Sequence, residues 1–299
     1  MRRGLASGIG AYVLWGLSPL FWKLLDDVAA ADVVANRAVW AFVLLAVVHT
    51  VRSSWPELAQ VAAVRRNRLV VVCTASLIAA NWGVFLWAVA DDRVLEVSLG
   101  YFINPLVSVL LGVVLLRERM RPAQWVAVAF AAAGVGWFVI EVGSLPWVSL
   151  VLAGTFAVYG LLRKTASFGS IDGLTMETAL MSVGALIFLT VRALQGEGAM
   201  GVDVPGRTVL LVLSGAVTAA PLLLFADSAR RIPLSVVGVL QFLAPSIQFF
   251  LGVWVFDEPF DTNRLVGFAF IWVGLAVFVI DGLRAARPSF DPNRVGSPP

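Results

Sequence analysis

Side chains suited to catalysis or metal binding are scarce in this chain of 299 residues. There is one cysteine, Cys73, and one histidine, His49, so an intramolecular disulfide and a multi-histidine metal site are both excluded. A serine hydrolase would need His49 to reach a distant serine, and no Gly-x-x-x-x-Gly-Lys-Ser/Thr phosphate loop occurs. The residues therefore predict no enzyme, no cofactor and no metal site.

The composition places the chain in a membrane. Hydrophobic residues make up 60% of it and charged residues 14%, with a mean hydropathy of +0.89. Soluble domains hold about 45–50% apolar and about 25% charged residues, so this much apolar surface cannot face water. Helices of about 20 apolar residues cross a bilayer. The sequence predicts an all-α integral membrane protein with ten transmembrane helices, at 4–25, 33–51, 69–90, 94–116, 122–140, 146–162, 174–191, 208–229, 233–256 and 264–282.

The basic residues predict the orientation of these spans. Sixteen lie on one side, Arg2 and Arg3 among them, and six lie on the other. Because lysine and arginine gather on the cytoplasmic side, both termini are expected in the cytoplasm and the protein in the cell membrane. A formal net charge of +3 is too slight for a nucleic-acid partner.

An internal repeat divides the chain. Residues 81–141 align without gaps to residues 221–281, with 15 of 61 positions identical. The identical pairs include Pro105 with Pro245, Glu118 with Glu258 and Gly134 with Gly274, which apolar composition alone does not produce. We expect two five-helix repeats, at 4–141 and 146–283, and a disordered cytoplasmic tail at 284–299.

Five spans per repeat imply that the repeats are inverted. An odd number of spans makes the second half enter the membrane from the opposite side, which is a design of transporters that bind substrate near the midplane. Pro105 and Pro245 are predicted to interrupt the fourth and ninth spans at mid-depth, because proline removes a backbone donor. A packing kink without further use is the alternative.

Neutral polar and aromatic groups gather near the predicted midplane. Polar groups there face the interior of a bundle, either as substrate contacts or as hydrogen-bond links between helices. Amides, hydroxyls and rings without a set of carboxylates favour a small amphipathic or zwitterionic solute. The predicted substrate-binding residues are Trp15, Asn81, Trp82, Tyr101, Asn104, Tyr159 and Gln241, with Ser18 and Gln248 at similar depth.

Three charged residues in the spans have candidate roles. Lys23 and Arg37 lie toward the outer ends of adjacent spans and are predicted to form an anion-facing pair at the entrance, or else to snorkel toward the headgroups. Glu177, at the cytoplasmic start of the seventh span, is either a proton site or a carboxylate at a helix start.

A carrier with alternating access is the function that these features favour. A channel for small solutes is the alternative, and a receptor or an enzyme fits less well because the loops are short. The expected partners are a small-molecule substrate, the lipid bilayer and protons as a coupling ion. Small-residue spacings such as that of Gly4 and Gly8 let helices approach closely. They serve either packing inside a monomer or the contact face of a weak homodimer.

Several motifs resemble the RarD branch of the EamA family, in the drug/metabolite transporter superfamily. They cover nearly the whole chain: YVLWGLSPLFWK (12–23), NRAVW (36–40), NW (81–82), LGYFINPL (99–106), YGLLRK (159–164), PLLLF (221–225) and LQFLAP (240–245). The resemblance implies a ten-helix permease that moves amino acids, other metabolites or drugs across the cytoplasmic membrane, commonly outward. Asn36 departs from the branch, which has histidine there.

Overall fold

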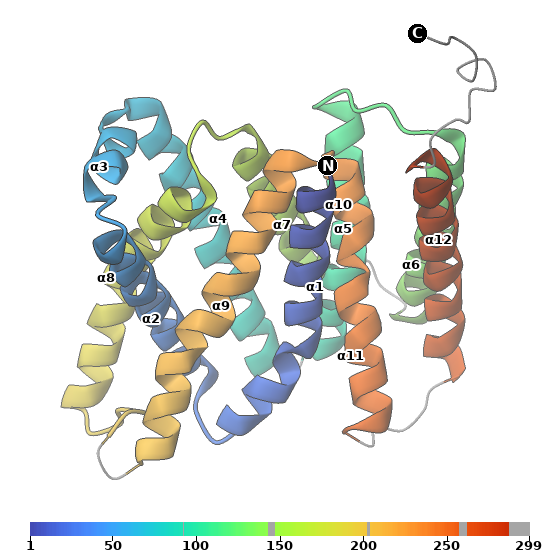
Figure 1. Ribbon diagram of the computed structural model, residues 1–299. Coiled ribbons are helices and arrows are strands. Elements are labelled where there is room, and N and C mark those ends of the chain that lie inside the picture. The colour runs from blue at the N-terminus through green and yellow to red at the C-terminus, as the bar shows by residue number, and fades with distance from the viewer. Residues whose placement is uncertain (92, 143–146, 202–203, 257–261, 287–299) are drawn as a thin grey trace, which may run out of the picture.

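The computed structural model describes residues 1–91, 93–142, 147–201, 204–256 and 262–286. These residues form a helical bundle (Figure 1). Its elements are α1 (Arg2–Trp22), η1 (Lys23–Leu25), α2 (Ala30–Val51), α3 (Trp55–Ala63), α4 (Arg65–Ala90), α5 (Val94–Val114), α6 (Pro122–Val142), α7 (Trp147–Thr165), α8 (Ser170–Leu194), α9 (Pro205–Arg231), α10 (Leu234–Gln241), α11 (Leu243–Trp254) and α12 (Thr262–Ala286).

Nine segments of the described chain are long and apolar enough to cross a membrane, where the sequence predicted ten spans. The predicted sixth span corresponds to α7, which is not one of the nine. This helix carries Ser149 and Thr155, with Arg163 and Lys164 in its last turn. Because α7 packs against α4, α5 and α9, it is shielded by protein and has less need of apolar residues.

Two further differences from the predicted spans are local. A short helix, α3, occupies the connection between the second and third spans, with Pro56 in its first turn and Leu58 buried. The predicted ninth span is broken at Phe242 into α10 and α11. Of the predicted tail, residues 284–286 belong to α12, and positions 287–299 lie outside the described residues.

Apolar side chains cover much of the outside of the bundle. On α8, Val183, Leu186 and Ile187 are each more than half exposed, and Leu69 and Val72 are similar on α4. Exposed apolar surface on this scale is unfavourable in water and is expected where lipid tails surround the protein. The protein is therefore an all-helical, multi-pass membrane protein.

Helices α6 and α12 pack side by side at one edge of the bundle, in opposite directions (Figure 1). A Cβ atom added at Gly134 on α6 would lie 2.6 Å from the carbonyl oxygen of Gly267 on α12. One added at Gly274 would lie 2.6 Å from the carbonyl oxygen of Ala127. Since the later residue of α6 meets the earlier residue of α12, the two helices are antiparallel.

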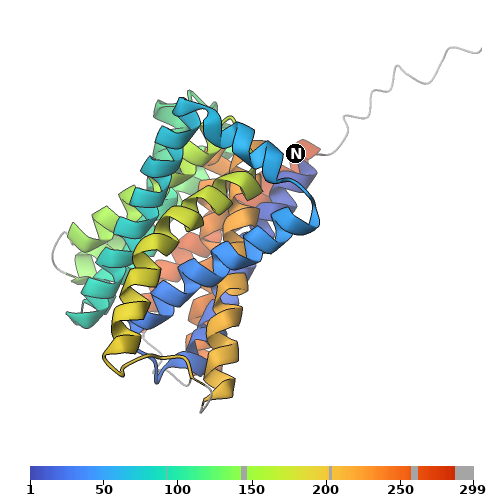
Figure 2. The same ribbon diagram turned by 90° about the vertical axis from the view of Figure 1, so that its left-hand side faces the viewer.

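Helices α2 and α8 form a second antiparallel pair, visible on the face shown in Figure 2. Near the start of α2, Asp32 Oδ2 lies 3.0 Å from Arg192 Nη2, near the end of α8. Near the end of α2, His49 Nε2 lies 3.1 Å from Thr175 Oγ1, near the start of α8. These polar contacts fix the pair at both ends.

The N-terminal half of α1 packs closely on the C-terminal half of α9. A Cβ atom at Gly4 would lie 2.7 Å from Arg231 Cβ, and one at Gly8 would lie 2.7 Å from Ser228 Oγ. Ser7 donates a hydrogen bond of 2.8 Å to Asp227. The small-residue spacing of Gly4 and Gly8 therefore serves packing inside the bundle. We call the end of the bundle that carries the N-terminus the N end, and the opposite one the η1 end (Figure 1).

Candidate functional site

A cavity of about 1030 Å³ lies inside the bundle. It reaches the surface at the η1 end, where Leu25, Asp26 and Val28 connect α1 to α2 and form part of its wall. Its deeper wall includes Tyr12, Ile78 and Leu222. A volume of this size holds a small organic molecule.

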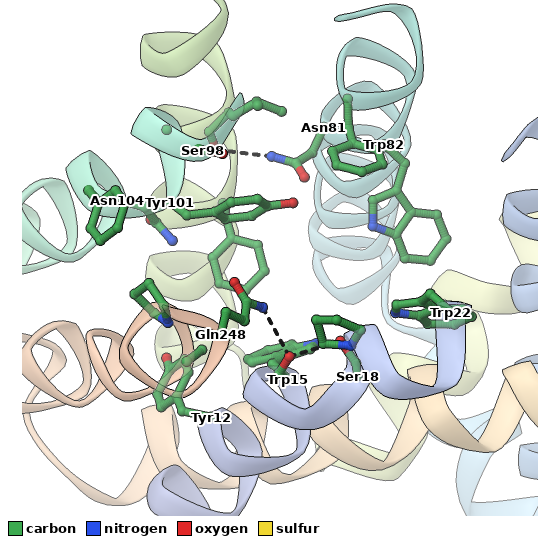
Figure 3. Close-up of a pocket in the computed structure, with 18 of the residues that line it drawn as sticks. Tyr12, Trp15, Ser18, Trp22, Asn81, Trp82, Ser98, Tyr101, Asn104 and Gln248 are labelled. Atoms are coloured by element: carbon green, nitrogen blue, oxygen red, sulfur yellow. Dashed lines mark hydrogen bonds between the residues drawn. The ribbon is translucent and has the colours of Figure 1, made fainter. Parts of the chain in front are cut away.

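Six of the seven predicted substrate-binding residues line this cavity, and Figure 3 shows several of them converging on it. They come from four helices that are distant in sequence. The six are Trp15 on α1, Asn81 and Trp82 on α4, Tyr101 and Asn104 on α5, and Gln241 on α10.

Tyr159, the seventh, does not line the cavity. Its side chain is fully buried, and its hydroxyl donates a hydrogen bond of 3.2 Å to Glu177 Oε2. Its ring stacks on Phe225, with centroids 6.0 Å apart. The residues of α7 that do line the cavity are Leu152 and Phe156, on a neighbouring face of the helix. The sequence predicted the depth of Tyr159 along its span, and depth does not tell which way a side chain points.

Two of the lining amides also link helices. Asn81 Nδ2 donates to the Leu152 carbonyl and to Thr155 Oγ1, both at 2.9 Å, and so joins α4 to α7. Gln241 Nε2 donates to Ser108 Oγ at 3.0 Å and joins α10 to α5. The two interpretations of these amides, cavity lining and interhelical hydrogen bonding, thus hold for the same side chains.

Polar atoms without a partner lie beside these links. The oxygens Asn104 Oδ1 and Gln241 Oε1 are buried and accept no hydrogen bond from the described residues. Both residues are more than nine-tenths buried, and both belong to the cavity wall. A buried acceptor without a donor is costly, so both amides are suited to rearrangement or to an N–H or O–H group brought by a ligand.

Of the predicted entrance pair of Lys23 and Arg37, Arg37 lines the cavity and Lys23 does not. The Nε atom of Arg37 donates a hydrogen bond of 2.9 Å to Thr218 Oγ1 on α9. The guanidinium carbon lies 4.8 Å from the ring centre of Trp22 and 4.5 Å from that of Trp82. Lys23 is in η1, where its Nζ lies 4.5 Å from the ring centre of Phe256, and it is not part of the cavity wall.

The two repeated prolines have different surroundings. Pro245 lines the cavity, three residues after the break at Phe242. Pro105 does not line it, and α5 continues through it without a break. A Cβ atom at Gly238 would lie 2.7 Å from the Pro105 carbonyl oxygen, so α5 and α10 approach closely there. The predicted interruption is thus present in the ninth span and absent from the fourth.

Glu177 is buried outside the cavity. Its Oε1 lies 3.3 Å from Arg163 Nη1, and both side chains are almost fully buried. Arg163 also donates a hydrogen bond of 2.9 Å to the Ser170 carbonyl. The carboxylate therefore has a fixed cationic partner from α7, which sequence depth could not reveal.

Two kinds of residue that line the cavity were not predicted from the sequence. One is Thr218, whose hydroxyl accepts the hydrogen bond from Arg37. A hydroxyl in the middle of an apolar span is a signal that could have identified it. Phe102, Phe138, Phe249 and Phe268 form an aromatic part of the wall from four different helices. Nothing in the sequence separates these rings from ordinary core phenylalanines.

Comparisons with known proteins relate the chain to membrane transporters. Residues 2–140 match the model of the EamA-like transporter family. The chain is 41% identical to a RarD protein of Streptomyces exfoliatus, over 96% of its own length and 91% of the relative's. It is 43% identical to an uncharacterized transporter of Pseudomonas aeruginosa, over 96% of both chains.

A solved crystal structure has the same fold. It aligns with a TM-score of 0.71 and 19% sequence identity, over 95% of this chain and 99% of the other. At this identity the likeness extends to the fold alone.

Proposed function

The chain belongs to the EamA-like transporter family, in its RarD branch, and from that premise we propose that it is a permease for a small organic solute such as an amino acid, a metabolite or a drug. It is accordingly a transporter and not an enzyme. The observation that carries the proposal is the cavity of about 1030 Å³, which is lined by rings and neutral polar groups. Such a wall suits an amphipathic solute better than a bare inorganic ion.

The mechanism that we propose is alternating access between two inverted five-helix repeats, at 4–141 and 146–283. Its support is the antiparallel packing of equivalent elements. Residues 127 and 134 on α6 correspond in the repeat to residues 267 and 274 on α12, and the contacts pair Gly134 with Gly267 and Ala127 with Gly274. Phe130 and Phe270, which are equivalent to each other, also meet, with ring centres 6.4 Å apart. Contacts of this kind arise around a twofold axis that inverts one repeat.

The described conformation corresponds to the outward-open state in this proposal. The positive-inside distribution assigns the N end to the cytoplasm and the η1 end to the outside. The cavity reaches the surface at the η1 end. We propose export as the direction of transport, which the family resemblance favours.

Contacts at the N end support closure on the cytoplasmic side. Glu118 Oε1 accepts a hydrogen bond of 2.7 Å from the Leu234 N–H, and Glu118 Oε2 accepts one of 2.8 Å from the Ser235 N–H. Lys164 Nζ donates to the carbonyls of Ala229, at 3.1 Å, and Ile232, at 2.6 Å. A carboxylate at the start of α10 and a cation at the end of α9 complement the two helix dipoles.

Glu177 is the proton site that we propose for coupling. It is a carboxylate inside a span, and Arg163 and Tyr159 from α7 and Thr74 from α4 face it. Protonation would remove the charge that Arg163 pairs with, and so would couple a proton to the packing of α7 against α8. We propose a monomer or a weak homodimer as the working unit.

The test is transport by the purified protein in proteoliposomes, with labelled amino acids and chloramphenicol, with and without a pH gradient. Saturable flux of one class that responds to the gradient is the expected result. Saturable flux that does not change with the gradient would contradict proton coupling but would still indicate a carrier. Non-saturating flux would indicate a channel and overturn alternating access.

A further inference from the structure

Arg37 differs from Arg163 and Arg192, two other arginines within the described spans. Arg163 pairs with Glu177, and Arg192 pairs with Asp32. For Arg37, no carboxylate among the described residues lies within ion-pair distance, although it is part of α2 and lies inside the bundle. A cation within a span is costly unless a partner compensates for it, so the missing counter-charge needs an explanation.

The surroundings of Arg37 hold its side chain in place without neutralising it. Thr218 accepts the Nε–H, and the rings of Trp22 and Trp82 lie within 4.8 Å of the guanidinium carbon. Aromatic faces stabilise a guanidinium but leave its in-plane donors free. The four N–H groups on the two terminal nitrogens make no hydrogen bond to the described residues. An oriented donor pair of this type matches the two oxygens of a carboxylate.

The rest of the described cavity wall supplies little negative charge that could compete. Asp26 is the carboxylate among the described lining residues, and it is exposed where the cavity reaches the surface. The deeper wall is neutral, with amides, hydroxyls and the phenylalanine rings. A single cation in a neutral, partly aromatic cavity favours a solute with one carboxylate on an apolar body.

We propose that the transported solute carries a carboxylate and that Arg37 binds it. This inference rests on the proposed function, since it names the substrate class of that cavity. It assigns Thr218, Trp22 and Trp82 the role of positioning residues for the guanidinium. The solute then supplies the counter-charge that the described chain does not.

The experiment measures ligand binding to the purified full-length protein in detergent. The probes are the proteinogenic amino acids, each paired with the amine that lacks its carboxylate, with chloramphenicol as a solute without one. Binding is read as the shift in melting temperature and then by titration. We expect one or more amino acids to bind the wild type and their matched amines to fail. Arg37→Gln should weaken that binding about tenfold or more, as expected for a charge-assisted hydrogen bond.

Two variants separate recognition from folding. Lys23→Gln removes a nearby cation that is not part of the cavity wall and should leave binding unchanged. Arg37→Lys keeps the charge but loses the planar fork, so it should bind more weakly than the wild type and more tightly than Arg37→Gln. Without ligand, Arg37→Gln should change the melting temperature little, because the lost contacts to Thr218 and the two rings are offset by removal of a partly buried charge that has no ion pair. A purely structural role for Arg37 would lower the melting temperature clearly.

Three results would overturn the inference: amines that bind as well as their acids, an Arg37→Gln variant that binds acids like the wild type, or no binding of any carboxylate in the panel. Saturable transport of chloramphenicol alongside any of these results would leave the proposed function intact. Absence of saturable flux for every compound in proteoliposomes would instead count against the proposed function itself.

Discussion

Gly134 on α6 faces the carbonyl oxygen of Gly267 on α12 so closely that a Cβ atom at Gly134 would lie 2.6 Å from that oxygen. The equivalent contact, between Gly274 and the carbonyl oxygen of Ala127, has the same distance. Real Cβ atoms do not approach a backbone oxygen this closely, so only glycine fits either position without moving a helix. Helices α6 and α12 therefore pack closely around two glycines, one on each helix.

Gly134→Ala should therefore destabilise the protein, by about 1–3 kcal/mol if the helices must separate. Gly274→Ala should have an effect of similar size. Gly136→Ala is the matched control, because a Cβ atom there meets nothing within 4 Å. It should be neutral or slightly stabilising, since alanine favours a helix over glycine. Melting temperatures in detergent decide this, and equal effects at 134 and 136 would contradict the close approach.

Glu118→Gln should loosen the N end of the bundle. The two carboxylate oxygens accept hydrogen bonds from the Leu234 and Ser235 N–H groups, and a glutamine would turn one acceptor into a donor facing a donor. The measurement uses Val109→Cys in a Cys73→Ala background. With Glu118→Gln added, this cysteine should react several-fold faster with a thiol reagent supplied at the N end, the side that we propose to be cytoplasmic. Val109 is buried and packs near Gly238. Unchanged labelling would show that Glu118 does not hold this end closed.

Asn104→Ala and Gln241→Ala should lower transport while leaving the amount of protein in the membrane unchanged. Both residues line the cavity and carry buried oxygens without a donor. Thr190→Ala is the control, since its hydroxyl is exposed, bonds to the Leu186 carbonyl within α8 and does not line the cavity. Equal losses of transport and abundance in the two alanine variants would assign the amides to packing alone.

Arg163→Gln should lower stability strongly, by about 3–5 kcal/mol, because it leaves the Glu177 carboxylate buried without its cation. The double variant Arg163→Gln with Glu177→Gln should recover much of that loss. Thermal unfolding of the two single variants and the double variant gives the coupling energy. Additive effects would show that the two side chains do not stabilise each other.

Glu177→Gln should make transport insensitive to a pH gradient. Transport measured without a gradient should continue in this variant. The amide cannot take up or release a proton, although it keeps a hydrogen-bonding group beside Arg163 and Tyr159. Flux in proteoliposomes, with and without the gradient, provides the measurement. A gradient response equal to that of the wild type would exclude Glu177 as the coupling site.

The sequence by itself determined the class of the protein and the depth of its polar groups. Apolar runs of membrane length, separated by short charged breaks, allow only a helical bundle in lipid, because each helix satisfies its own backbone. The same reading placed Trp15, Asn81, Trp82, Tyr101, Asn104 and Gln241 at one depth, and the structure brings all six to one cavity. The depth of a residue in the membrane follows from its position along a spanning helix, and that position can be counted in the sequence.

Only the tertiary structure decided which way each side chain points and what it meets. Tyr159 was predicted at the same depth as the cavity residues but turns toward Glu177, and Arg37 turns into the cavity toward Thr218. Pro105 and Pro245 are equivalent in the repeat, yet only the second follows a broken helix. Rotation of a helix about its axis, and the neighbour that it faces, depend on the packing of all the helices together. That packing is the physical reason why the sequence located the polar groups and the fold assigned their partners.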